Sequence, residues 1–116
     1  MVEIIEKKSK FYGYAYKVTS VQQVESFLKE LKAEYKKATH FCYAYNIKTG
    51  GVFARAVDDG EPSGTAGKPI YNVIEKKNLT DVLIVVVRYF GGIKLGAGGL
   101  TRAYSKCASE AIKEII

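Results

Sequence analysis

Hydrophobic and polar residues alternate with a period of two over residues 10–18 and again over residues 39–47. This period places successive side chains on opposite faces of an extended chain, so both segments are predicted to be strands. A further strand over residues 52–57 follows a turn at residues 48–51, and it is predicted to form a hairpin with 39–47. Residues 81–90 are apolar on both faces and predict a strand in the interior of the sheet.

A period of 3.6 residues indicates three helices. The first begins after Ser20, which forms a capping-box pattern with Gln23. The second spans about residues 66–77, and the third carries an apolar stripe over residues 100–115. This order favours an α+β fold, a two-layer sandwich in which a mixed four-stranded sheet carries helices mainly on one face, in the order β-α-β-β-α-β-α.

Composition narrows the classes of function. A chain of 116 residues predicts one domain over residues 1–116, and 18 basic against 12 acidic residues give a net charge of +6. This charge favours anionic partners such as RNA or the ribosome. No apolar segment of 18 residues occurs and the N-terminus has no apolar core of a signal peptide, so a cytoplasmic protein without membrane contact is predicted. The two cysteines lack metal-ligand spacing, and we expect reduced thiols, no metal and no cofactor.

Aromatic residues of the first strand allow two interpretations. Three tyrosines share one face: Tyr12, Tyr14 and Tyr16. Such a stripe either stacks nucleic-acid bases on an open sheet or is covered by helices, and we favour the covered face. A small basic cluster, Lys7, Lys8 and Lys10, is expected to be a solvated end.

A glycine-rich segment separates residues 81–90 from the last helix, with Gly91, Gly92, Gly96, Gly98 and Gly99. Glycine adopts positive φ freely and permits close backbone approach, so this segment must be tightly bent, closely approached or both. Helix starts attract anions. We predict an anion- or nucleic-acid-binding surface formed by these glycines together with four cations, Arg88, Lys94, Arg102 and Lys68. Neither dinucleotide nor P-loop spacing is present, and tight strand–helix packing is the alternative.

Three acids lie within four positions at Asp58, Asp59 and Glu61. Clustered carboxylates suit a divalent cation, but acids that precede a helix also cap its N-terminus. We favour capping and keep metal binding as the minority alternative. His40 is the only candidate general base, and it has no paired nucleophile, so no catalytic residue is predicted and a non-enzymatic protein is favoured.

Four segments together resemble the IMPACT family, in particular its bacterial YigZ-type branch: KSKFYGYA at 8–15, ATHFCYAY at 38–45, DDGEPSGTAGKPI at 58–70 and VVVRYFGGIKLGAGGLTRAY at 85–104. The family-motif residues of the third segment are Asp58, Asp59, Gly60, Glu61, Ser63, Gly64, Thr65 and Gly67.

The resemblance implies a fold like the second domain of a small-subunit ribosomal protein, which also occurs in a translocation factor and in GHMP kinases. It implies a link to translation, since eukaryotic members restrain a starvation-activated kinase by competing for its ribosome-associated activator. Bacterial members are suspected of binding nucleic acid, and the family has no established catalytic residues. Relatives carry an additional RWD or ferredoxin-like domain that is absent from this sequence, so a stand-alone domain is expected and the kinase-regulatory role is not carried over.

The leading hypothesis is therefore a translation-associated binding module that contacts RNA or a ribosome-linked partner through the basic glycine-rich loop. One alternative is a phosphate- or nucleotide-binding protein or enzyme that uses both loops. The other is a protein-interaction domain without nucleic-acid contact. The sequence has no signal for an oligomeric state.

Overall fold

The computed structural model describes all 116 residues of the chain as five strands and three helices. The strands are β1 (Val2–Glu6), β2 (Ser9–Lys17), β3 (His40–Ile47), β4 (Phe53–Val57) and β5 (Val82–Tyr89). The helices are α1 (Val21–Glu34), α2 (Gly67–Lys76) and α3 (Gly96–Ile112). The α+β class is confirmed, and β1 is an additional strand that the sequence analysis missed. None of the three helices has the length and apolar character that a membrane span needs.

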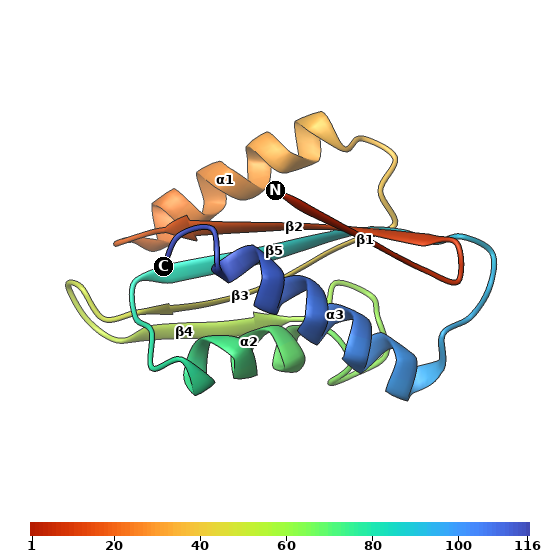
Figure 1. Ribbon diagram of the computed structural model, residues 1–116. Coiled ribbons are helices and arrows are strands. Elements are labelled where there is room, and N and C mark those ends of the chain that lie inside the picture. Colours follow the sequence, from red (N-terminus) through yellow and green to blue (C-terminus); the bar gives the residue numbers. More distant parts are fainter.

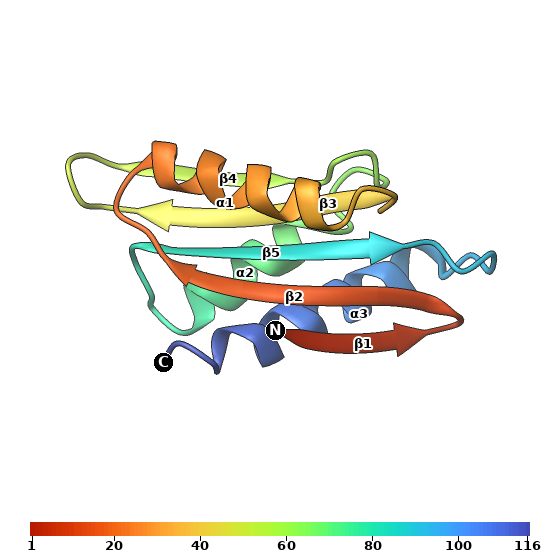
Figure 2. The same ribbon diagram turned by 90° about the horizontal axis from the view of Figure 1, so that it is seen from above.

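The five strands form one sheet in the order β1-β2-β5-β3-β4, visible from above in Figure 2. Every neighbouring pair is antiparallel, so the expected mixed sheet is corrected to an antiparallel one. The reason is the place of β5. The strands joined through α1, β2 and β3, run parallel to each other, but β5 lies between them and pairs with both.

Helices cover both faces of the sheet, with α1 on one side and α2 and α3 on the other (Figure 1). The core is accordingly divided in two by the sheet. Alternate residues of β5 serve the two halves: Leu83, Val85 and Val87 pack beneath α1, whereas Ile84 and Val86 pack against α2 and α3. Because α1 forms a layer of its own, the molecule has three layers instead of two, with two of its three helices on one face.

The tyrosine stripe of β2 lies under α1. The Tyr14 hydroxyl is hydrogen-bonded to that of Tyr35, and the ring of Tyr16 stacks on Phe27 with ring centroids 4.0 Å apart. Both tyrosines are therefore covered by a helix, as the favoured interpretation predicted. Tyr12, at one end of the stripe, also lines a surface groove.

The N-terminal capping predicted for α1 from Ser20 and Gln23 is present in the structure. The Ser20 hydroxyl accepts a hydrogen bond from the Gln23 amide at 3.2 Å, which satisfies one free N–H of the first turn. The Gln23 side chain accepts from the Thr19 amide at 2.6 Å, one residue earlier than in the standard capping box.

Candidate functional site

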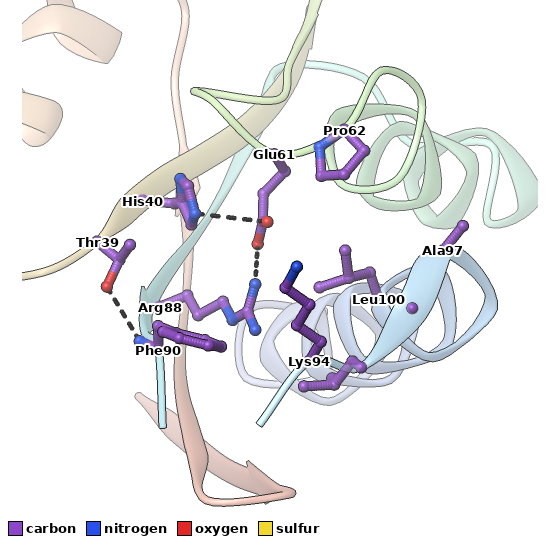
Figure 3. A pocket seen from close by; sticks show the side chains of 11 residues that line it. Thr39, His40, Glu61, Pro62, Arg88, Phe90, Lys94, Ala97 and Leu100 are labelled. Carbon is purple, nitrogen blue, oxygen red and sulfur yellow. Dashed lines mark hydrogen bonds and ion pairs between the residues drawn. The ribbon is translucent and has the colours of Figure 1, made fainter. Parts of the chain in front are cut away.

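A buried carboxylate, Glu61, joins four separate parts of the fold. Its Oε2 accepts hydrogen bonds from Arg88 Nη1 at 2.7 Å and from the Tyr104 hydroxyl, while Oε1 lies 3.4 Å from His40 Nε2. Glu61 comes from the loop before α2, and its partners come from β5, α3 and β3 (Figure 3 shows the contacts of Arg88 and His40). We call these four residues the Glu61 cluster.

Burial makes each of these contacts important to the folded state. An unpaired buried charge is very unfavourable, and Arg88 and Glu61 neutralise each other. Burial, with the neighbouring Cys42 and Glu61, raises the pKa of Tyr104 far above its ordinary value, so its hydroxyl remains a neutral donor. His40 Nδ1 lies 2.8 Å from the Asp59 carbonyl oxygen. A carbonyl only accepts, so Nδ1 carries the hydrogen.

Arg88, one of the four cations predicted at the anion-binding surface, is buried and does not lie on the open surface of the protein. The residue is only 4 % exposed, and its Nη2 donates to Ser9 Oγ at 3.1 Å. Its guanidinium carbon lies over the rings of both Phe11 and Phe90, 5.4 and 5.5 Å from their centroids. Arg88 Nε has no hydrogen-bond partner.

Asp58 and Asp59 are used by the chain itself. The Asp58 carboxylate accepts from the amides of Gly64, Ala66 and Gly67 at 2.8–3.2 Å and so caps α2, while Asp59 accepts from the Phe41 amide at 2.7 Å. Partial burial opposes ionisation of Asp58, but the three amide bonds outweigh it and hold its pKa below the ordinary value. With Glu61 bound to Arg88, the three acids form no group that could hold a metal ion.

The glycine-rich segment is both closely approached and sharply bent. A Cβ on Gly91 would lie 2.1 Å from the carbonyl carbon of Lys8, so only glycine fits beside the β1–β2 turn. Gly92 and Gly96 have φ of +89° and +74°, which favour glycine. The remaining two glycines, Gly98 and Gly99, lie in the first turn of α3, which begins at Gly96.

The N-terminus of α3 differs from that of α2 in having no cap. No side chain accepts from its first amides, whereas Asp58 accepts from those of α2; the first turn of neither helix contains an acidic residue. These amides and the helix dipole together leave positive potential at Gly96 and Ala97.

A cavity of about 390 Å³ lies at this point, between the loop before α2 (residues 58–66) and the loop before α3 (residues 90–95), which we call the two motif loops (Figure 3). We call it the motif cavity. Its lining includes the Glu61 cluster except Tyr104, the first residues of α3 and the exposed Lys94; it is lined by Thr39, His40, Glu61, Pro62, Arg88, Phe90, Lys94, Leu95, Gly96, Ala97 and Leu100.

A second hollow, of about 400 Å³, combines lysines with aromatic rings. We call it the basic groove, and its lining is Lys8, Lys10, Tyr12, Tyr35, Tyr89 and Phe90. Tyr12 and Tyr35 stack with centroids 5.3 Å apart, and neither lysine is in an ion pair. Phe90, 48 % exposed, lines both the basic groove and the motif cavity, so the two hollows adjoin.

The predicted site residues are therefore divided by the fold. Lys94 and Arg102 are exposed, the first at the motif cavity and the second in a hollow of about 290 Å³ with Lys7 and Lys106. Lys68 is exposed in the first turn of α2 and lines neither hollow.

Sequence reasoning missed the partnership of His40, Glu61 and Tyr104, and it missed the aromatic wall of the basic groove. One signal was available for Arg88, because it continues a strand that is apolar on both faces. The basic cluster at the β1–β2 turn and the start of β2 was a signal for the groove, but its aromatic partners Tyr35 and Tyr89 come from distant segments.

This arrangement defines an α+β domain with two motif loops joined through a buried carboxylate. The sequence model of the Impact N-terminal domain matches residues 7–112. The IMPACT family member YvyE of Bacillus subtilis is 48% identical over 113 residues, which cover 97% of this chain and 52% of that protein. The chain belongs to the IMPACT family, and it spans about half the length of such relatives.

Two solved structures resemble the fold. A crystal structure of a hypothetical protein superposes with a TM-score of 0.87 at 33% identity, covering 97% of this chain and 56% of that one. The structure of the two-domain translational regulator Yih1 superposes with a TM-score of 0.61 at 28% identity, covering 94% of this chain and 45% of that one.

Proposed function

We propose that this domain is a translation-associated module that binds single-stranded RNA along the basic groove. The kinship with Yih1, a translational regulator, supports the link to translation. The observation that carries RNA as the partner is the groove itself, in which Lys8 and Lys10 lie among four aromatic rings.

The two kinds of side chain in the groove, lysines and aromatic rings, each match one part of a nucleotide. Lysines attract the phosphate backbone, and a bound base stacks on an aromatic face with about 1–3 kcal/mol per base. Because every base has an aromatic face, such a groove binds RNA with little sequence preference.

Further cations lie at the same end of the molecule. Figure 2 shows that the β1–β2 turn, the end of α1 and the loop from β5 into α3 gather there. These segments carry four exposed lysines outside the groove, none of them in an ion pair: Lys7, Lys36, Lys37 and Lys94. Glu3, paired with Tyr12 across the β1–β2 ladder, is an acid at the edge of the groove.

The test compares two double variants of equal charge. Lys8→Ala with Lys10→Ala removes the groove cations, while Lys76→Ala with Lys77→Ala removes two exposed lysines from the end of α2, at the opposite end of the sheet (Figure 1). Fluorescence anisotropy with a labelled single-stranded RNA is measured at several salt concentrations. In the groove variant the negative slope of log K against log salt is expected to become shallower by about 1.4, since each neutralised phosphate contributes roughly −0.7.

The control pair is expected to bind like the unmodified protein. Equal affinities and slopes for the two double variants would show that the groove is not the RNA site. No binding by the unmodified domain at low salt would remove RNA as the partner.

A further inference from the structure

The motif cavity contains donors that the chain does not satisfy. The Arg88 side chain lines it and is only 5 % exposed, and its Nε has no hydrogen-bond partner. The first amides of α3 at Gly96 and Ala97 lack a side-chain cap. Lys94, also on the cavity wall, is in none of the four ion pairs of the chain.

The charges that face the cavity favour an anion. Glu61 is the only acid in its lining, and that carboxylate is already bound by Arg88 and Tyr104, with His40 beside it. Arg88 neutralises Glu61, so the positive charge of Lys94 and the dipole of α3 remain. In Figure 3 the Lys94 side chain extends toward the space between Glu61 and the start of α3.

The shape of the cavity selects for the end of a chain. Its volume of about 390 Å³ accommodates a phosphate with part of a nucleotide, and Pro62, Leu95 and Leu100 provide apolar walls. A phosphodiester carries a sugar on both sides, which hinders its approach to a donor as deeply buried as Arg88. A phosphomonoester has one free side and can enter with that side first.

We infer that the motif cavity binds a terminal phosphomonoester, held by Lys94, the Arg88 guanidinium and the free amides at the start of α3. The phosphate comes either from the end of an RNA strand in the basic groove or from a free mononucleotide. The first source rests on the proposed function, and it is favoured because Phe90 borders both hollows, so a strand in the groove leads to the cavity.

The experiment measures the affinity of the domain for one RNA sequence with hydroxyl ends, with a 5′-phosphate or with a 3′-phosphate. A nucleoside monophosphate is titrated in a separate arm. A terminal phosphate at one end is expected to tighten binding about tenfold, the effect of one charge-assisted hydrogen bond. Saturable binding of the mononucleotide alone, without RNA binding, would support the cavity and contradict the proposed function.

Two matched pairs of variants assign the preference to the cavity. Ala97→Glu places a carboxylate at the uncapped helix start and is expected to abolish the preference, while Ala97→Gln keeps it. Lys94→Met is expected to reduce the preference at least threefold, with Lys68→Met, in the first turn of the capped helix α2, as its control. Glutamate favours a helix N-terminus, so Ala97→Glu is expected to fold.

Three results would overturn the inference. Equal affinity for phosphate and hydroxyl ends, with no mononucleotide binding, would leave RNA binding intact and remove the cavity as a phosphate site. A preference that survives Ala97→Glu would place the phosphate elsewhere. Equal loss in Lys94→Met and Lys68→Met would indicate a general charge effect.

Discussion

The helices α2 and α3 pack on the same face of the sheet, and each follows a family-motif loop, but their first turns differ. The amides at the start of α2 are bound by Asp58, whereas no side chain caps those of α3. The first loop is thus completed by its own carboxylates. The second loop leads into a helix whose first amides are unbound, at the wall of the motif cavity. The contrast supports a structural role for the loop of residues 58–66, and it is the basis of our proposal that an external anion binds at the start of α3.

The largest effect is expected from Glu61→Ala, which would remove the carboxylate that joins the two loops. Arg88 would remain buried without a counter-charge, and the free energy of unfolding is expected to fall by about 3–5 kcal/mol. Urea denaturation measures this. The control is Glu110→Ala, whose exposed pair with Lys113 makes a change within about 0.5 kcal/mol the expected result. Similar losses in both variants would show that the cluster does not hold the loops together.

Asp58→Ala is expected to lower the free energy of unfolding by about 2 kcal/mol, because two amides at the start of α2 and the Gly64 amide in the preceding loop lose their acceptor. Thr101→Ala is the matched change in α3. That hydroxyl donates to the Ala97 carbonyl and caps nothing, so its loss is expected to stay within about 0.5 kcal/mol. A small cost at Asp58 in the same denaturation assay would contradict the difference between the two helix starts.

Lowering the pH is expected to reduce the free energy of unfolding through Asp58, at the start of α2, and not through the start of α3. The pKa of Asp58 is lowered in the folded protein, so the carboxylate stabilises the fold above its unfolded pKa of about 4. This contribution is lost as the pH falls from about 4 through the lower folded pKa. Unfolding measured at several pH values is expected to show a shallower acid slope for Asp58→Ala than for the unmodified protein. Parallel slopes would mean that Asp58 does not titrate with folding.

The smallest effect is expected from Ala97→Glu, measured as stability without ligand. A carboxylate at the uncapped start of α3 is expected to add about 0.3–1 kcal/mol, because it interacts favourably with the helix dipole. Ala97→Gln, of nearly equal size, is the control and is expected to be neutral. The thermal midpoint measures both, and a destabilised Ala97→Glu would show that the helix start is not electropositive.

The sequence sufficed for most elements because their hydrophobic periods are long and regular. It missed β1, where Ile5 follows Ile4 and breaks the alternation of apolar and polar residues, whereas β4, of the same length, was predicted from the turn before it. It expected a mixed sheet, but the two strands joined through α1 are not neighbours. Here β5 lies between them. Insertion of a distant strand is decided by packing over the whole chain and leaves no local pattern.

The candidate site was only partly predictable. Both loops and the free cations Lys94 and Arg102 stand out in the sequence, but the burial of Arg88 depends on a partner 27 residues away, Glu61. The basic groove is likewise assembled from β2, β5 and the end of α1. Such pairings follow from strand order, which the sequence pattern did not reveal.

The central claim of our proposal is that α3, unlike α2, begins at an open anion site beside the basic groove. It is tested most directly by amide chemical shifts in a ¹H–¹⁵N spectrum during titration with a 5′-phosphorylated RNA. The amides of Gly96 and Ala97 are expected to shift in a saturable manner, while those of Ala66 and Gly67, already bound to Asp58, stay in place. Saturating shifts at Ala66 and Gly67 with none at Gly96 and Ala97 would contradict the account.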